Sequence, residues 1–321
     1  MEGAKGKLAL LFPGQGSQFV GMGADLYKAF AEARAVYQCA DELLGFKLSK
    51  LCFEGPEEQL NDTANTQPAI YVTTWALWQA LAPRLEAVKA RVAFAAGHSL
   101  GEFCALAVTS ALEFSEGLRL VRVRGEAMRD AGAAAPGGMA AIIGLDDQMV
   151  AEIVVAANGD GQGVWVANYN SPGQVVIAGE HEALERALNL ARERGAKRAV
   201  ALAVSVASHT PLMAAAGERL GRALEAMRIK RPWVPVVSNA SACPLAEPEE
   251  IKTALLRQLT SPVRWVESVQ AMIQGGATTM LEVGPRSVLA GLIKRISAET
   301  TLQAVTDLAS LEALRWEGVS P

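Results

Sequence analysis

A serine flanked by glycines is the residue whose setting most clearly suggests chemistry. Ser99 lies in the Gly-x-Ser-x-Gly segment 97–101, between an apolar run at 92–96 and a helix expected from Glu102. A sharp strand-to-helix turn strains the serine backbone, and glycines on either side avoid a clash. The turn holds the hydroxyl at a helix N-terminus, where backbone N–H groups favour a developing oxyanion. The pattern therefore predicts a nucleophile at Ser99.

A serine hydroxyl needs a base to take its proton, and the chain has three histidines. His98 is the neighbour of Ser99, and adjacent residues on such a turn generally point apart. His181 begins an expected surface helix between two glutamates, where it is better explained as a solvated cap. His209 follows an apolar strand and precedes a helix, and ligands of α/β sheets gather at such strand ends. We expect His209 to be the base. Among acidic residues, Glu282 ends a strand but fits a structural carboxylate equally well.

The composition is that of a globular protein with a substantial core. Half of the 321 residues are apolar, 20% are charged, and the formal net charge is −4, which argues against nonspecific nucleic-acid binding. No apolar stretch reaches the roughly eighteen residues that a membrane helix needs. The four scattered cysteines form no Cys-x-x-Cys pair, which favours a reducing compartment over a disulfide framework or a zinc site. We expect a cytoplasmic protein without a metal.

Strands alternate with helices along most of the chain, which predicts α/β architecture with a largely parallel sheet. The patterns indicate strands at 8–12, 92–96, 234–237 and 279–283, and helices at 23–44, 67–81, 102–109, 115–130, 211–227, 249–259 and 263–275. Between them, an Ala- and Gly-rich linker at 133–138 precedes a different order: strand 139–144, helix 147–157, strands 164–167 and 174–178, helix 182–194 and strand 198–206. This β-α-β-β-α-β order is the split βαβ, or ferredoxin-like, motif. We predict a large domain from 1–132 and 207–321, with a ferredoxin-like domain inserted at 133–206.

Further segments carry a family resemblance. They are 12–18, 97–102, 122–125, 137–141, 168–174, 208–209, 257–263 and 282–285. In this order they resemble the malonyl-CoA:acyl-carrier-protein transacylases of bacterial fatty acid synthesis, and more distantly the acyltransferase domains of polyketide synthases. The resemblance implies an α/β-hydrolase-like large domain with a parallel sheet and the small inserted domain.

The resemblance also implies roles for individual residues. Ser99 would be acylated and His209 would be its base, oriented by the main-chain carbonyl of Gln258 in place of an acidic residue. The oxyanion hole would be formed by the backbone N–H groups of Gln15 and Leu100.

Substrate selection would depend on Arg124. The resemblance matches Arg124 to the arginine that holds the free carboxylate of malonate, and a planar guanidinium suits this role because it can bind a carboxylate through two parallel hydrogen bonds. An acetyl group would leave it desolvated and unpaired, at a cost of about 1–3 kcal/mol. Gln258, His98 and Asn168 are also expected at the substrate site. Ser208, beside the base, is the small residue usual in stand-alone malonyl enzymes of this family, which favours malonyl and leaves the preference at the α-carbon of the acyl group open.

The implied reaction is ping-pong transfer of malonyl from coenzyme A to the phosphopantetheine thiol of acyl carrier protein, by a monomer that needs no cofactor, membrane or nucleic acid. Carrier proteins are acidic, so a basic group at a helix end is a candidate docking site. Its members are Arg192, Arg194, Lys197 and Arg198. A solvated helix terminus explains these charges equally well.

Three other functions compete with this interpretation. A hydrolase would use the same Ser–His chemistry. A dinucleotide-binding protein is suggested by Gly14-x-Gly16 after a strand, but Phe19 stands where its third glycine is required. A non-catalytic carrier-binding module would have no need of Ser99, His209 and Arg124 together. Fatty acid synthesis, polyketide assembly and malonate decarboxylation remain open as pathways.

Overall fold

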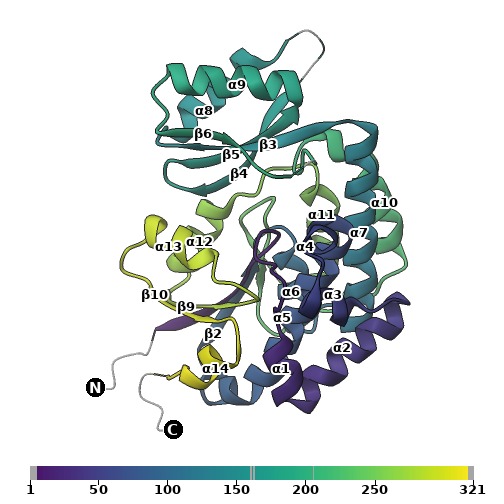
Figure 1. The fold of residues 1–321 in the computed structure, drawn as a ribbon. Coiled ribbons are helices and arrows are strands. Elements are labelled where there is room, and N and C mark those ends of the chain that lie inside the picture. The colour runs from purple at the N-terminus through teal and green to yellow at the C-terminus, as the bar shows by residue number, and fades with distance from the viewer. Residues whose placement is uncertain (1–5, 160, 162, 205, 317–321) are drawn as a thin grey trace.

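The computed structural model of the chain describes residues 6–159, 161, 163–204 and 206–316. It contains two separate sheets (Figure 1). The six-stranded sheet has the order β10-β9-β1-β2-β7-β8 and is parallel except for its last pair. Its strands are β1 (Lys7–Phe12), β2 (Val92–Gly97), β7 (Val236–Val237), β8 (Pro244–Leu245), β9 (Ala277–Val283) and β10 (Thr301–Val305).

The central strand β1 shows why this sheet forms. It is a continuous apolar run because both of its faces are covered, as is usual for parallel strands. Successive side chains point to opposite faces. Leu8, Leu10 and Phe12 pack into the main core with the long helices, whereas Ala9 and Leu11 pack into a second cluster with Trp265 and other apolar side chains.

Helices surround the larger sheet (Figure 1). They are α1 (Ala24–Ala29), α2 (Ala31–Leu44), α3 (Leu48–Glu54), α4 (Glu57–Asn61), α5 (Thr63–Leu85), η1 (Glu86–Arg91), α6 (Gly101–Val108), α7 (Phe114–Ala134), η2 (Pro211–Met213), α10 (Ala214–Glu225), α11 (Pro248–Gln258), α12 (Trp265–Gln274), α13 (Leu289–Ile296) and α14 (Leu308–Ala313). The long helices α5 and α7 pack against each other. Among the described residues, no helix has the length and apolar character needed to span a membrane.

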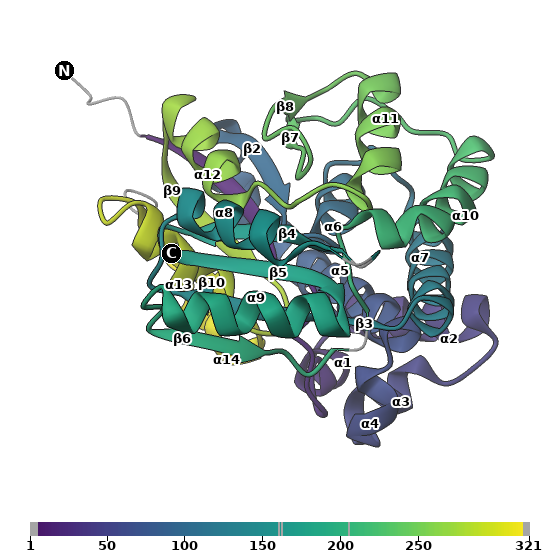
Figure 2. The ribbon, with the colours of Figure 1, turned by 90° about the horizontal axis from the view of Figure 1, so that it is seen from above.

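The second sheet is antiparallel and has the order β4-β5-β3-β6. Its elements are β3 (Gly137–Ile143), α8 (Asp147–Ala157), β4 (Val164–Ser171), β5 (Gln174–Glu180), α9 (His181–Glu193) and β6 (Arg198–Ala201). Both helices pack on one face of the sheet through their own apolar cluster (Figure 2). The predicted fold class, with a parallel-rich sheet and a small ferredoxin-like unit, is confirmed. The division of the chain into domains at 133 and 206 stays a prediction.

Several predicted element bounds are wrong. The expected linker at 133–138 shrinks to two residues, because α7 continues to Ala134 and β3 begins at Gly137. Alanine is the best helix former, and Pro136 disfavours helix at the residue before it. The strand expected over 198–206 ends at Ala201, where pairing with β3 stops, and Ser205 lies outside the described residues.

Other differences come from backbone breaks and from short elements. The single helix expected over 23–44 is two helices, because Phe30 is extended, with φ −121° and ψ 129°. The strand expected at 234–237 is reduced to β7, and Pro235 before it has no N–H to donate to a ladder. The sequence patterns missed several short elements entirely: α3, α4, η1, β8, α13, β10 and α14.

Candidate active site

Ser99 occupies a tight turn between β2 and α6. Its φ of 52° lies in the left-handed region, which a residue with a side chain rarely adopts. The flanking glycines are required by close packing. A Cβ at Gly97 would lie 1.9 Å from the carbonyl carbon of Gly101, and a Cβ at Gly101 would lie 2.0 Å from the carbonyl oxygen of Phe12. The turn thus holds the Ser99 hydroxyl at the start of α6.

His209 meets this hydroxyl. Its Nε2 lies 2.8 Å from the Oγ of Ser99, and its Nδ1 lies 2.9 Å from the main-chain oxygen of Gln258 at the end of α11. A carbonyl oxygen can only accept, so Nδ1 carries the proton and Nε2 is left with its lone pair toward the serine. This arrangement prepares His209 to accept the serine proton.

The charge state of His209 suits the same task. Burial, reinforced by the nearby positive charge of Arg124, lowers its pKa from an ordinary 6.5 to about 3. The imidazole is therefore neutral at neutral pH. A neutral imidazole is the form that can act as a general base.

Arg124, on α7, contributes a buried positive charge to the same hydroxyl. Its Nη2 donates to the Oγ of Ser99 and to Oε1 of Gln258, each at 3.0 Å, and its Nη1 donates to Oε1 of Gln67 at 2.7 Å. Its side chain is 1% exposed, and its Nε has no hydrogen-bond partner among the described residues.

The acceptors around Arg124 are all neutral. Burial lowers the pKa of its guanidinium to about 10, so the group remains charged at neutral pH. A buried cation without a carboxylate partner is costly, and an incoming anionic group would relieve that cost. The site is therefore electrostatically suited to a negatively charged substrate.

Asn239 clamps the turn at Ser99. Its Oδ1 accepts from the backbone N–H of Ser99 at 2.6 Å, and its Nδ2 donates to the carbonyl of Gly97 at 2.6 Å. Sequence analysis missed both this residue and Gln67. A signal did exist for Asn239, because it follows the predicted strand 234–237 and ligand-binding residues collect at strand ends.

The first loop of the chain lies against the same turn. A Cβ at Gly14 would lie 2.3 Å from the carbonyl oxygen of His98, so the loop backbone approaches the turn closely. Within the part of the chain that is described, the backbone N–H groups of Gln15 and Leu100 donate no hydrogen bond. The side chain of Gln15 is held by the hydroxyl of Thr63, at 3.1 Å.

Comparison with known proteins places this geometry in a family. A family model described as "Acyl transferase domain" matches residues 9–313. The malonyl CoA-acyl carrier protein transacylase of Bacillus subtilis is 44% identical over 306 residues, covering 95% of each chain. That of Escherichia coli K12 is 42% identical over 310 residues, covering 96% of this chain and 98% of the other. The chain belongs to this acyltransferase family. The resemblance seen in the sequence motifs is thereby confirmed.

Solved structures agree with this assignment. An acyl-carrier-protein S-malonyltransferase from Bartonella henselae superposes with a TM-score of 0.92 at 40% identity, covering 96% of this chain and 98% of that one. A second structure is of a type II polyketide synthase acyl-carrier protein in complex with its malonyl-transacylase. It has a TM-score of 0.90 at 43% identity, again covering 96% and 98% of the two chains.

Two further residues expected at the substrate site, His98 and Asn168, differ in their surroundings. The Nε2 of His98 lies 2.9 Å from Oδ1 of Asn170, and its ring packs edge-on against Trp265. Asn168 is buried in β4 and forms an isolated bridge with Val263. His98 is therefore engaged by a residue of the small sheet, and sequence analysis did not foresee the part played by Asn170.

The four basic residues proposed for docking are all exposed, but they differ in their partners. Arg192 donates to the carbonyl of Ala199, and Arg194 lies 3.8 Å from a carboxylate oxygen of Glu152. The aliphatic stem of Lys197 lies against Gly144. Arg198 begins β6, the strand at the edge of the small sheet. Two of the four charges are thus engaged within the molecule.

The two polar residues that sequence analysis set aside have structural surroundings. His181 is exposed at the first position of α9. Glu282 is buried and accepts hydrogen bonds from the end of the loop before α13 and from the first two residues of that helix. Its donors are Ser287, Val288, Leu289 and Ala290. Among the described residues, no group of three or more His, Cys, Asp or Glu side chains could hold a metal ion.

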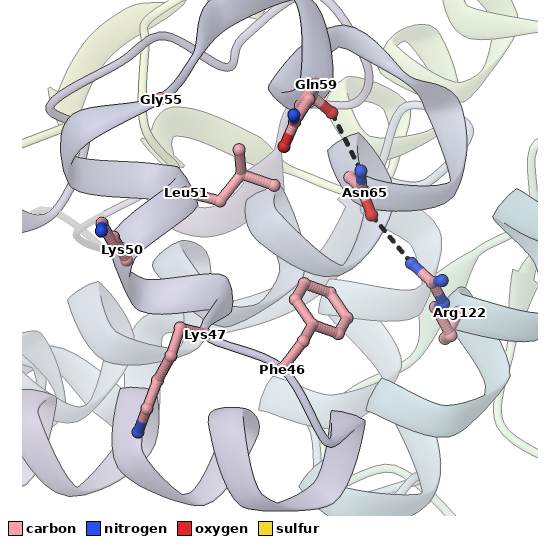
Figure 3. A pocket seen from close by; sticks show the side chains of 8 residues that line it. All are labelled: Phe46, Lys47, Lys50, Leu51, Gly55, Gln59, Asn65 and Arg122. Carbon is pink, nitrogen blue, oxygen red and sulfur yellow. Dashed lines mark hydrogen bonds between the residues drawn. The ribbon is translucent and has the colours of Figure 1, made fainter.

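A cavity of about 410 Å³ lies apart from these residues (Figure 3). It is lined by Phe46, Lys47, Lys50, Leu51, Gly55, Gln59, Asn65 and Arg122. In Figure 3 the guanidinium of Arg122 binds the side chain of Asn65, which in turn donates to the carbonyl of Gln59. None of the residues expected in the catalytic site lines this cavity.

Proposed function

We propose that this acyltransferase transfers the malonyl group of malonyl-CoA to the phosphopantetheine thiol of an acyl carrier protein through a malonyl ester of Ser99. The observation that carries the proposal is one hydroxyl that contacts both a neutral imidazole and a buried guanidinium. The first contact supplies a nucleophile with its base, and the second selects an acyl group with a free carboxylate. The names of the relatives support the same donor and acceptor.

In the first half-reaction Ser99 attacks the thioester carbonyl while Nε2 of His209 takes the hydroxyl proton. The carbonyl oxygen becomes negatively charged and is stabilised by the backbone N–H groups of Gln15 and Leu100. The carbon–sulfur bond then breaks, and the proton on His209 passes to the departing thiolate of coenzyme A. Malonyl remains as an ester on Ser99.

In the second half-reaction the roles of nucleophile and leaving group are exchanged. His209 takes the proton of the carrier-protein thiol, and the sulfur attacks the ester carbonyl. The same N–H groups stabilise the new tetrahedral intermediate. Its collapse breaks the ester bond, and His209 returns the proton to the Oγ of Ser99.

Arg124 selects the acyl group by its charge. The malonyl carboxylate replaces neutral acceptors at the guanidinium and supplies a directly bound counter-charge, and His98, Asn168 and Gln258 are proposed to contribute to the same substrate site. An acetyl group supplies no charge and would leave the buried cation as it is. This difference corresponds to about 1–3 kcal/mol in favour of malonyl.

The acidic carrier protein is expected to dock beside the small sheet. Among the four exposed cations proposed for docking, Lys197 and Arg198 are the two whose charged groups have neither a hydrogen bond nor a salt bridge to another described residue, unlike Arg192 and Arg194. Arg192 and Arg194 would add to the local positive potential. We further propose that the protein acts as a monomer and needs no cofactor. We also propose that it acts in the cytoplasm, where malonyl-CoA is found.

The mass of the intact protein after mixing with malonyl-CoA tests this function. The unmodified sequence should gain one malonyl unit, and Ser99→Ala should gain none. Ser110→Ala is a matched control, because Ser110 also has a left-handed backbone, with φ 62°, but is exposed at the end of α6. It should acquire the malonyl unit normally.

The same mixture separates a transferase from a hydrolase. Without carrier protein the malonyl ester should persist, and adding carrier protein should discharge it onto the thiol. Rapid release of free malonate without an acceptor would instead establish a hydrolase. An adduct on Ser99→Ala would exclude Ser99 as the nucleophile.

A further inference from the structure

Glu102 is a buried carboxylate to which the reaction steps give no part. It lies on α6, three residues after Ser99, and its side chain is 3% exposed. One of its oxygens, Oε2, accepts two hydrogen bonds: from Nε2 of Gln258 at 2.7 Å and from the backbone N–H of Asn239 at 3.3 Å. Both donors belong to residues that contact the catalytic pair.

The first of these residues, Gln258, controls the base. Its main-chain oxygen accepts from Nδ1 of His209 at 2.9 Å, and its side-chain amide donates to the main-chain oxygen of Ser99 at 3.0 Å. The oxygen of the same amide accepts from Arg124. Glu102 therefore fixes which way this amide faces, since a carboxylate can accept only from its NH₂ side.

The second residue, Asn239, controls the nucleophile. Its side chain accepts from the backbone N–H of Ser99 and donates to the carbonyl of Gly97. These bonds hold a serine in a backbone conformation that is unfavourable by itself. The backbone N–H of Asn239 in turn donates to Oε2 of Glu102, the same oxygen that accepts from the Gln258 amide.

We propose that Glu102 is a positioning residue that keeps the Oγ of Ser99 and the Nε2 of His209 within hydrogen-bonding distance of each other. Its single oxygen joins two segments distant in the chain, the end of α11 that orients the imidazole and the loop after β7 that clamps the serine turn. The inference rests on the proposed function only in taking Ser99 as nucleophile and His209 as base. It assigns to a buried glutamate an alignment task performed through other residues and without contact to the substrate.

The protonation state of Glu102 is consistent with this task. Burial raises the pKa of its carboxyl to about 7, while hydrogen bonds from Gln258 and Asn239 and the charge of Arg124 act in the opposite direction. Both the acid and the carboxylate retain an oxygen that can accept these bonds. Alignment therefore requires an acceptor at this point and not a negative charge, and an amide should serve.

Substitution of Glu102 by Ala and by Gln tests the proposal. The readouts are the rate constant for sulfonylation of Ser99 by phenylmethylsulfonyl fluoride, which has no carboxylate to bind Arg124, and kcat and KM for malonyl-CoA. Because a misplacement of about 1 Å can cost about 10²-fold, Glu102→Ala should lower sulfonylation and kcat together by roughly 30- to 100-fold. KM should change by less than about threefold, and Glu102→Gln should retain activity within about fivefold.

Two further variants keep the test decisive. Glu282→Gln removes a different buried carboxylate, one that binds the loop before α13 and the first residues of that helix, and should lower the melting temperature without changing sulfonylation. Glu102→Asp withdraws the acceptor by one methylene and should show an intermediate loss if Glu102→Ala does not fold.

Two results would overturn the proposal: Ser99 reacting at its normal rate in Glu102→Ala or Glu102→Asp, or an equal loss in Glu102→Gln and Glu102→Ala. The second result would mean that the charge matters and not the alignment. A failure of malonyl transfer itself would be recognised separately, from the unmodified sequence and Ser99→Ala in the mass experiment.

Discussion

Two regions of the molecule each contain an arginine of helix α7, but only one of the two guanidinium groups is paired with a carboxylate. Arg122 and Arg124 are two residues apart on α7, and residues so spaced do not share a face. Arg122 lines the open cavity of Figure 3, where it pairs with Glu126 at 2.7 Å and contacts Asn65. Arg124 points into the interior, where its partners are neutral amides and the hydroxyl of Ser99.

The difference shows which feature marks a functional site. The cavity around Arg122 has volume and three basic side chains, but its arginine is already neutralised by a carboxylate. The guanidinium of Arg124 is hydrogen-bonded only to neutral groups, and Glu102 acts on it without a hydrogen bond, so an anionic substrate that binds it directly would offset much of the cost of burying the cation. A desolvated and unpaired charge beside a nucleophile is thus more informative than the size of a hollow.

The sharpest test of this contrast removes each arginine in turn. Arg124→Ala should lower kcat/KM for malonyl-CoA by about 100-fold or more, because the substrate carboxylate loses its buried partner. Acylation by acetyl-CoA should fall far less. In Arg122→Ala, kcat/KM for malonyl-CoA should stay within about threefold of its value in the unsubstituted protein, as expected for loss of a partly exposed ion pair. The test is to measure kcat/KM for malonyl-CoA and for acetyl-CoA with both variants. Equal losses in the two variants would contradict the distinction between the two regions.

A second test uses the effect of Arg124 on its neighbour His209. With a pKa of about 3 in place of 6.5, the imidazole stays neutral as the pH falls, so the base remains competent. Sulfonylation of Ser99 should therefore be nearly flat between pH 8 and 5 in Glu102→Gln, where no carboxyl titrates beside the site. An unperturbed histidine would lose roughly 30-fold at pH 5.

The two arginines should again differ in this pH experiment. Arg124→Ala removes a charge that lowers the His209 pKa and should move the acid limb upward, whereas Arg122→Ala should leave it in place. The stability of the fold is monitored alongside. A histidine that is neutral when folded and protonated when unfolded makes stability decline as pH drops below 6.5, toward the folded-state pKa. An inflection at pH 6.5 in the sulfonylation rate of the folded protein would contradict a buried, neutral His209.

The smallest effect is expected from exposed cations. Reversing Lys197 and Arg198 together to Glu should raise KM for carrier protein several-fold and leave acylation by malonyl-CoA intact, because surface charges act through a screened field. The increase should shrink at high salt. The matched control is the double reversal of Lys47 and Lys50, two exposed lysines of the cavity in Figure 3. A raised KM in the control alone would move docking to the cavity.

Much of the fold followed from patterns within short stretches. The apolar runs of β1 and β2 predicted buried strands, and the order of elements from β3 to β6 predicted the ferredoxin-like unit. Elements of only a few residues, such as β8 and α4, carry too little pattern to be recognised. Their existence depends on contacts with other segments, as β8 depends on its pairing with β7.

The residues of the candidate site also fall into two groups, those predicted from local sequence and those whose surroundings depend on tertiary contacts. The sequence by itself determined the strained turn at Ser99, because the need for Gly97 and Gly101 is a matter of local sterics, and it singled out His209 as the base by elimination. Only the tertiary structure decided that Arg124 is buried with neutral hydrogen-bond partners and that Glu102 connects the residues that hold the proposed nucleophile and base. Burial and hydrogen-bond partnership arise when distant segments pack together, and their effects on charge and pKa do not exist until the chain has folded.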